Sequence, residues 1–325
     1  MAVLQLNQIF TGLLSGLIPG KLQSRGLLEI LALFPIQHNA RSQFVPPLQN
    51  LKLVAVPDYG KMTFRNTTSK GLLILPMHIG FFQDGAQNHA TSRAMVLDAQ
   101  EDLTATDCFC IQETQGGLLD EANQRFIVLP LGLRPRAFVE RDEEDFSRLW
   151  IHIENYTRKF GVSKSGHLER FIRPYFPKLQ TFRHAFETEP GQIGAVYFIA
   201  GQLVGIEVAP NPEYWQDLWP ILLIYCYGPE VFLAENLQSK SARTAMDLYY
   251  IEDLEDLRHE LRASRRTDLK ARIKLVAELS AFEWKHEVDR IQHKLRIVNL
   301  EHQEWAGQMV QKDSEILYLS LFRNK

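Results

Sequence analysis

The sequence predicts an α+β protein with a mainly antiparallel sheet flanked by helices, and a long charged helical segment toward the C-terminus. Short β-rich runs cluster within residues 1–140. Two further β-rich runs, joined by a two-residue connection that contains glycine, predict a hairpin at residues 193–208. Strand and helix patterns do not alternate regularly along the chain, as they would in the βαβ units of a parallel sheet.

Length and composition are those of an ordinary soluble globular protein. The chain has 325 residues, which fits one large domain or two closely packed ones. Its hydrophobic content of 45% and charged content of 23% are close to average. The formal net charge of −3 favours neither nucleic acid nor a membrane surface as a partner. Three cysteines are too few for the disulfide framework of a small secreted protein.

The N-terminal residues 1–22 are apolar but lack the features of a secretory signal. They have neither a basic region at the start nor a small-x-small cleavage site. A run of about 18 or more uncharged apolar residues, which a membrane-spanning helix needs, does not occur in the sequence. We therefore expect a cytoplasmic protein that does not enter a membrane.

The sequence pattern divides the chain into three parts. Residues 1–245 are expected to form an α+β core, and residues 246–296 a charged helical segment. Residues 297–325 are expected to return to the core and to end in a strand at residues 316–322. A closing strand of this kind commonly pairs with a sheet formed earlier in the chain, so a freely separable C-terminal domain is not expected.

Periodicity predicts the other elements of the core. Turn-forming residues separate short apolar or alternating runs, as in a sheet whose strands are joined by turns. The predicted strands are residues 51–56, 71–75, 93–97, 107–112 and 126–131. Residues 142–161 are predicted to form a helix that begins with four acidic residues and ends at a glycine. Residues 213–227 are apolar around most of a helix, which we expect to be buried.

The segment of residues 246–296 is charged and helical in pattern. Its apolar positions recur at spacings of three and four, at Leu248, Ile251, Leu254, Leu257, Leu261, Ile273, Val276 and Leu279. This narrow stripe predicts either a surface helix covered by its own core or a seam that meets a partner. An acidic stretch precedes the basic residues 262–274, which suits an antiparallel helix pair with opposite charges facing each other. We expect a protein contact here, most simply in a homo-oligomer.

Residues 81–117 carry the side chains most suited to a functional site. The first half of this block places two amides and an imidazole in a turn, and the second half places two thiols in an inner strand. The candidate ligand-binding residues are Gln87, Asn88, His89, Cys110, Gln112 and Glu113. An amide side chain both donates and accepts hydrogen bonds, which suits reading a sugar or a base edge and equally suits bonding the backbone of its own turn. We expect Gln87, Asn88 and Cys110 to lie close together.

Other chemistry has weaker support in the sequence. Cys108 and Cys110 lack the two further ligands of a zinc site, and a reactive thiol would need a neighbouring base or positive charge. Neither a phosphate-binding glycine loop nor a nucleophile elbow occurs. The basic residues 262–274 and the arginine-aromatic residues 170–176 are more typical of a solvated face and a core edge than of a nucleic-acid site. We therefore predict neither a metal nor a cofactor, and nucleic acid is not an expected partner.

Several motifs together carry a resemblance to a known family. Residues 85–88 read Gly-Ala-Gln-Asn, and residues 110–112 end a strand with Cys-Ile-Gln. A glycine-spaced hairpin and a following helix occupy residues 191–227, and residues 316–322 form a closing strand. In this succession the chain resembles the ARPP-1 family, named for association with ADP-ribosylglycohydrolase and rhodanese-phosphatase domains. The resemblance covers about residues 25–235 and the last dozen.

The resemblance implies a prokaryotic system that handles ADP-ribose or NAD-derived groups, including defence against phage. The chain departs from the family pattern at Gln112, which stands where the family has an acid, while Glu113 is displaced by one residue. On a strand, a displacement of one residue moves the carboxylate to the opposite face.

Two functions of different class remain open. In the first, the protein is an interaction or assembly module whose charged helical segment meets a partner. In the second, it is an enzyme or binder of a nucleotide-derived small molecule that uses Gln87, Asn88 and Cys110. The sequence favours the first, because it contains no phosphate loop, metal quartet or catalytic triad. The deciding feature is whether these side chains line an open pocket or are sealed.

Overall fold

The structure, a computed structural model, describes residues 10–36, 41–83, 86–114, 124–162, 165–238 and 253–324. In this part of the chain the largest sheet has eight strands in the order β1-β2-β12-β13-β17-β16-β15-β14, and every neighbouring pair is antiparallel. These strands are β1 (Leu17–Arg25), β2 (Leu28–Pro35), β12 (Gly194–Ile199), β13 (Gln202–Val208), β14 (Lys285–Gln292), β15 (Leu295–Glu301), β16 (Trp305–Lys312) and β17 (Glu315–Arg323). The sheet thus joins strands from both ends of the chain.

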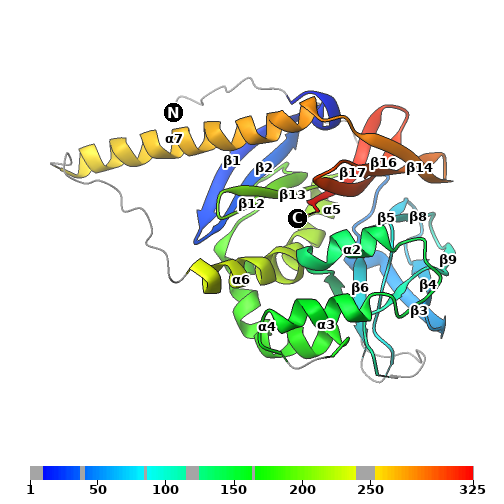
Figure 1. The fold of residues 1–325 in the computed structure, drawn as a ribbon. Helices are drawn as coiled ribbons and strands as arrows, with labels where there is room; N and C mark the ends of the chain where they lie inside the picture. Colours follow the sequence, from blue (N-terminus) through cyan, green and yellow to red (C-terminus); the bar gives the residue numbers. More distant parts are fainter. Residues whose placement is uncertain are drawn as a thin grey trace.

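Three smaller antiparallel sheets lie beside the large one, in the blue and cyan part of Figure 1. Their strand orders are β10-β7-β6-β11, β3-β4-β9 and β5-β8. The strands are β3 (Leu51–Asp58), β4 (Lys61–Asn66), β5 (Leu73–Leu75), β6 (Ile79–Gln83), β7 (His89–Ala90), β8 (Met95–Leu97), β9 (Asp102–Ala105), β10 (Phe109–Cys110) and β11 (Gln124–Val128). Each of the five early runs predicted from the sequence overlaps one of these strands.

The described residues also form helices. They are α1 (Pro47–Asn50), α2 (Arg134–Val139), α3 (Trp150–Arg158), α4 (Leu168–Ala185), α5 (Pro212–Ile221), α6 (Gly228–Gln238) and α7 (Leu254–Glu278), with 3₁₀ turns η1 (Gly12–Leu14), η2 (Leu131–Leu133) and η4 (Leu279–Ala281) and the π-helical turn η3 (Leu222–Tyr227). The buried helix predicted at residues 213–227 is confirmed as α5 and η3, in which Trp215 and Cys226 are fully buried. Among the described residues, no helix has the length and apolarity that crossing a membrane requires.

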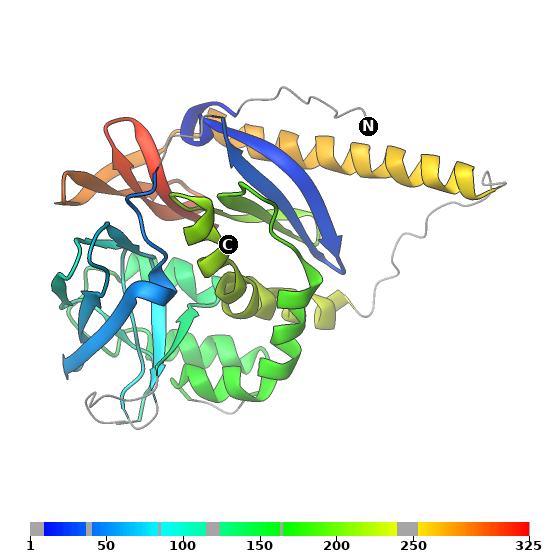
Figure 2. The same cartoon turned by 180° about the vertical axis from the view of Figure 1, so that it is seen from behind.

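The eight-stranded sheet separates two cores. Helix α7 lies across one face, and α2, α5 and α6 lie on the other (Figures 1 and 2). Side chains alternate between the two faces of a strand, and β2 follows this rule. Ile30 packs with the helical core that contains Trp215, whereas Leu31 packs with the core that contains Ile273 of α7. The predicted α+β class with a mainly antiparallel sheet is confirmed.

The predicted hairpin is present as β12 and β13. Its connection is Ala200 and Gly201, which both adopt positive φ, at 51° and 81°. This conformation matches the right-handed twist of the two strands. The predicted closing strand is also present, because β17 lies between β13 and β16 and pairs with both.

The predicted helical segment is shorter than expected. Helix α7 ends at Glu278, and residues 285–292 and 295–301 form β14 and β15, so the expectation of helix as far as residue 296 is wrong. The turn between these strands has positive φ at His293 and Lys294, at 50° and 65°. Neither residue is the glycine or asparagine that usually marks such a turn, so these residues carry no local signal for a hairpin. Leu248 and Ile251 of the predicted stripe lie outside the described residues.

The helix predicted at residues 142–161 is also shorter, since α3 covers only Trp150–Arg158. The acidic residues come before it in a turn. The carboxylate of Asp145 accepts hydrogen bonds there from the backbone N–H of Ser147 at 2.8 Å and from its hydroxyl at 2.7 Å. Asp145 therefore bonds a turn, Asp142 pairs with Arg93 at 2.8 Å, and the acidic run does not begin the helix.

Candidate functional site

Strand pairing brings the two halves of the candidate block together. His89 on β7 is the centre of this arrangement, because it pairs with Phe81 of β6 on one side and with Cys110 of β10 on the other. The turn before β7 therefore lies beside the end of β10. Asp84 and Gly85, which belong to the predicted turn, lie outside the described residues.

Gln87 contacts the end of β10 directly. Its amide nitrogen Nε2 donates to the sulfur of Cys110 at 2.7 Å and to the backbone carbonyl of Gln112. Gln87 and Cys110 are almost completely buried, at 1% and 0% exposed. The expected approach of the amide turn to the cysteine strand is thus found, with the amide of Gln87 as the link.

Asn88 is bonded through both its backbone and its side chain. Its backbone N–H donates to Oε1 of Gln112 at 3.1 Å, and its carbonyl accepts from Ile111 at 3.0 Å. Its side-chain oxygen accepts from the backbone N–H of Gln83 at 2.8 Å, and its side-chain nitrogen donates to Glu169 at 3.0 Å. The polar atoms of Asn88 therefore connect β6, the end of β10 and α4.

His89 is fully buried and is held as a neutral ring. Its Nε2 accepts from the backbone N–H of Gly60 at 3.2 Å, so its Nδ1 carries the proton and donates to the carbonyl of Gln87 at 3.0 Å. Burial lowers the pKa of His89 to about 4, against the smaller opposite effect of the bond to Gln87. His89 therefore ties the turn between β3 and β4 to the candidate block as a neutral group.

Gln112 and Glu113 diverge at the end of β10. Gln112 is 9% exposed, and its amide oxygen bonds the backbone of Asn88. Glu113 is exposed, and its carboxylate accepts from the backbone N–H of Gly166 at 2.7 Å. Glu113, the acid displaced by one residue, thus points away from Gln87 and Cys110, whereas the side chain of Gln112 is buried beside Asn88.

Glu169 is the member of this cluster that the sequence did not indicate. It lies in the first turn of α4, is 13% exposed, and contacts Asn88, Arg125 and Arg173 at 3.0, 2.6 and 2.9 Å. Its neighbour His167, together with these three donors, holds the pKa of the Glu169 carboxyl well below its usual range. A carboxylate 81 residues from Asn88 along the chain has no local sequence signal that would join it to this block.

The thiols of the block are held in their neutral form. Burial raises the pKa of Cys110, and its hydrogen bonds with Gln112 and Gln87 only partly oppose this increase. Burial raises the pKa of Cys108 well above its usual value, and this side chain packs in a small core with Met62 and Phe64. A nucleophilic cysteine requires the thiolate, so this environment does not prepare either sulfur for attack.

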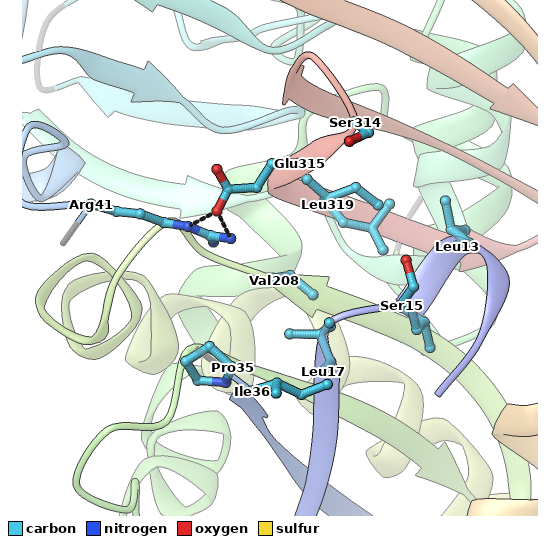
Figure 3. A pocket seen from close by; sticks show the side chains of 13 residues that line it. Leu13, Ser15, Leu17, Pro35, Ile36, Arg41, Val208, Ser314, Glu315 and Leu319 are labelled. Atoms are coloured by element: carbon cyan, nitrogen blue, oxygen red, sulfur yellow. Dashed lines mark hydrogen bonds and ion pairs between the residues drawn. The ribbon is translucent and has the colours of Figure 1, made fainter. Parts of the chain in front are cut away.

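The pocket in Figure 3 lies elsewhere, at one end of the eight-stranded sheet. It has a volume of about 390 Å³ and is lined by residues of the N-terminal segment and of β1, β2, β13 and β17. The apolar side chains labelled in the figure are Leu13, Leu17, Pro35, Ile36, Val208 and Leu319. At its edge, Nε and Nη2 of Arg41 both donate to Oε1 of Glu315, at 3.0 and 2.7 Å. The candidate residues of the 81–117 block do not line this pocket.

The comparison with protein families agrees with the motifs. The model of ARPP-1, the ARG and Rhodanese-Phosphatase-superfamily-associated Protein domain, matches residues 20–322. The chain belongs to the ARPP-1 family. The match spans nearly the whole chain, so the candidate block, the hairpin and the closing strand all lie within the ARPP-1 domain. A search of curated proteins and a search of solved structures each returned no significant match.

Proposed function

We propose that this ARPP-1 chain is an interaction or assembly module of a cytoplasmic prokaryotic system, and that α7 contacts another protein chain, most simply a second copy of itself. The family's association with ARG and rhodanese-phosphatase proteins supports an associated role. It also suggests that the system handles ADP-ribose or NAD-derived groups, with phage defence as one setting. The observation that carries the proposal is the exposure of the first half of α7.

The two halves of α7 have different surroundings. In the second half, Ile273 and Val276 are buried against the sheet, and Arg272 pairs with Glu29 of β2 at 2.6 Å. In the first half, Leu254 is 72% exposed and Leu261 is 38% exposed. Figure 1 shows the yellow end of α7 reaching past the edge of the sheet. The domain therefore covers only part of the apolar stripe.

A helical end of this kind has a physical reason to bind a partner. Short isolated helices are marginal in water, because most helical stability in proteins comes from packing. Asp253 caps the start of α7, since its carboxylate accepts from the backbone N–H groups of Glu255 and Asp256 at 2.7 and 2.8 Å. Burial of each leucine side chain in an interface contributes about 1.5–3 kcal/mol. Leu254, with Leu261 two turns away on the same face, can supply such an interface.

Charge along α7 supports an antiparallel pair. Glu255, Asp256 and Glu260 occupy the first two turns, and Arg262, Arg265 and Arg266 follow them. Two copies that run in opposite directions would set the acids of one helix against the arginines of the other. Exposed ion pairs are worth only about 0.2–1 kcal/mol each. The leucines must therefore supply most of the association energy, and the charges set its direction.

The candidate block gives further support to this proposal. The amides of Gln87 and Asn88 bond groups of the block itself, Gln83 included, and of Glu169, and both residues are 1% exposed. A ligand that used these amides would have to replace bonds already made. This arrangement favours a structural role for the block and an interaction role for the protein.

The experiment that tests the proposal is light scattering over a range of protein concentrations. We expect the intact chain to form dimers and the variant Leu254→Glu/Leu261→Glu to be monomeric but folded. The matched control is Val139→Glu/Ile151→Glu, which places the same charges on apolar residues that are 65% and 55% exposed on α2 and α3. The control should remain dimeric. A monomeric intact chain, or a dimer that survives both leucine changes, would contradict the proposal.

The alternative is an enzyme or binder of a nucleotide-derived small molecule that uses Gln87, Asn88 and Cys110. The convergence of these side chains with Glu169 is the observation that favours it. Calorimetric titration with ADP-ribose and with NAD, repeated on Asn88→Ala, tests this function. Binding that is lost in the variant while the protein stays folded would support it, and an absence of heat with both ligands would exclude it for these two ligands.

A further inference from the structure

A second groove follows the outer edge of the eight-stranded sheet. It has a volume of about 690 Å³ and is lined by residues of β1, by the end of α4 with the residues that follow it, and by α7. Its lining residues fall in 21–25, 184–187 and 265–269, so only the tertiary structure assembles it. Figure 2 shows β1 (blue) as the outermost strand, with α7 crossing near it.

Positive charge dominates the charged side chains of this groove. Lys21 and Arg25 come from β1, and Arg265 and Arg266 come from α7. Within the described ranges, none of these four cations forms an ion pair with a carboxylate, although other exposed cations such as Arg65 do. Unpaired cations gathered from two elements attract anions, because their fields add within the groove.

The two carboxylates of the groove do not balance these cations. They are Glu187 and Asp268, so the charged side chains that line the groove comprise four arginines and lysines against two acids. The backbone of Glu187 is tied to β1, because Gln23 donates to its carbonyl at 2.6 Å and accepts from its N–H at 3.0 Å. This pair of bonds fixes the residues after α4 against the strand and so fixes one wall of the groove.

Helix α7 is also fixed against the sheet. Arg272 donates from Nε to Glu29 at 2.7 Å, and its guanidinium lies 5.4 Å from the ring centre of Phe198. Arg265 and Leu269 lie seven and three residues before Arg272, which places all three on one face of a helix. Leu269 packs against the core on this side of the sheet. The anchored face of α7 therefore carries Arg265 to the edge of β1.

Besides its charged side chains, strand β1 offers backbone hydrogen-bond donors to a bound anion. Because β1 is the edge strand, some of its backbone N–H groups point away from β2 and have no partner in a neighbouring strand. Lys21, Gln23 and Arg25 alternate with Leu22, and Leu22 packs with the core beneath α7. The groove thus presents cationic side chains on both sides of an edge that can itself donate hydrogen bonds.

We propose that this groove binds a small molecule that carries two linked phosphate groups. The arginines of α7 and the cations of β1 line one groove, so the two phosphates of a diphosphate offer an anion to each set, and the planar guanidinium group binds phosphate oxygens in pairs. The volume of about 690 Å³ lies within the range of small-molecule sites. A nucleic-acid polymer is disfavoured, because the chain has a pI near 6.4, whereas domains that bind nucleic acid typically have a pI above about 9. The groove shares Arg265 and Arg266 with the charged stretch of α7 that we propose to face a second copy, so its test measures the binding of pyrophosphate and not the oligomeric state.

The test is calorimetric titration of the full chain with inorganic pyrophosphate at about 50 mM salt. We expect saturable binding at one site per chain that weakens several-fold at about 300 mM salt, because exposed charges are screened. Orthophosphate should bind about tenfold more weakly than pyrophosphate, since it can reach only one side of the groove. The variants Arg265→Gln/Arg266→Gln and Lys21→Gln/Arg25→Gln should each weaken the binding of pyrophosphate by about tenfold or more.

The matched control is Arg262→Gln/Lys274→Gln, which removes the same charge from the same helix at residues that do not line the groove. It should bind pyrophosphate as the intact chain does, and so should Asn88→Ala, which lies in the other candidate site. All the altered cations are exposed, so circular dichroism should show unchanged folding. The proposal is overturned by the absence of saturable heat, by equal weakening in groove and control variants, or by tighter binding of a single-stranded oligonucleotide than of pyrophosphate.

Discussion

Arg134 and Glu207 form a buried ion pair between the helices and the eight-stranded sheet. Nη1 of Arg134, in α2, lies 2.6 Å from Oε1 of Glu207, on β13, and the two side chains are 1% and 2% exposed. The hydroxyl of Tyr227 donates to the same carboxylate oxygen at 3.1 Å, and Nη2 of Arg134 donates to the hydroxyl of Ser320. The guanidinium also lies over the ring of Phe322, at 4.7 Å. Every direction around this pair is occupied by protein.

Removal of one partner from this pair should strongly destabilise the fold. Glu207→Ala leaves a buried guanidinium without a counter-charge, which costs about 3–5 kcal/mol in unfolding free energy. The double variant Arg134→Met/Glu207→Leu removes both charges and should regain a large part of this loss. Chemical denaturation measures both effects. The control is Asp102→Ala, which breaks an exposed pair with Arg65 and should change stability much less. Equal stability of Glu207→Ala and the intact chain would show that the pair is not coupled to folding.

Asn88 should contribute to stability through its two side-chain bonds. Asn88→Ala leaves the backbone N–H of Gln83 without its acceptor and removes one donor from Glu169, so we expect a loss of about 1–3 kcal/mol in unfolding free energy. Thermal or chemical unfolding measures this loss. The control is Gln49→Ala, because Gln49 is an exposed amide that bonds Asp217 at 3.1 Å. A stable Asn88→Ala protein would argue against a structural role for the block.

Stability should fall as the pH decreases below about 6.5, because buried histidines are neutral in the fold. The pKa of His89 is about 4 when folded, below the unfolded value near 6.5, so the unfolded state binds the proton more readily. The stabilisation from neutral His89 is fully present above the pKa of this residue in the unfolded state, and it is lost as the pH falls toward 4. By pH 5 the loss from His89 is about 2 kcal/mol. Burial also lowers the pKa of His78 well below its usual value, which adds a loss in the same direction.

The variant His89→Gln isolates the contribution of this one group. Glutamine retains a donor and an acceptor but does not titrate, so its unfolding free energy should depend less steeply on pH between about 5 and 6.5. Denaturant titrations at a series of pH values provide the comparison. An identical pH dependence in the variant and the intact chain would mean that His89 does not titrate as its burial requires.

The three thiols should resist alkylation in the folded protein. Cys108, Cys110 and Cys226 are all free and buried, and burial raises the pKa of each, that of Cys226 to about 12. Labelling by iodoacetamide at about pH 8 should be slow in the native state and complete after unfolding in guanidinium, because the thiolate is the reactive form. Mass spectrometry of labelled peptides identifies each site. Rapid native labelling of Cys110 would instead favour a reactive role in the candidate block.

Local sequence determined the elements whose signals are complete within a few residues. The hairpin at residues 193–208 was predictable because Ala200-Gly201 stands between two β-rich runs, and the buried helix because residues 213–227 are apolar on most sides. Where a local signal was missing, prediction failed. The turn at His293 and Lys294 contains neither glycine nor asparagine, and β14 before it lies within residues 246–296, for which the pattern predicts a helix.

The candidate block was likewise predictable only where the signal was local. The sequence predicted that Gln87, Asn88 and Cys110 approach one another, because the turn and the strand are about twenty residues apart and both are polar. In the structure, the pairing of β7 with β10 brings Gln87 against Cys110. It did not indicate that Glu169 completes the cluster. Whether the amides would face a pocket or each other also depended on the packing around them, which no local pattern encodes.

Tertiary packing determines which distant charged groups meet. Arg134 and Glu207 are 73 residues apart in sequence, and the cations of the sheet-edge groove come from segments more than 200 residues apart. Periodicity reports which face of an element is apolar, but a charged residue gives the same local pattern whether it is solvated, paired or gathered with others. The partner of a charged side chain is determined by the element that packs against it. Here these elements are the closing strand β17, which pairs with β13, and helix α7, which packs on the sheet.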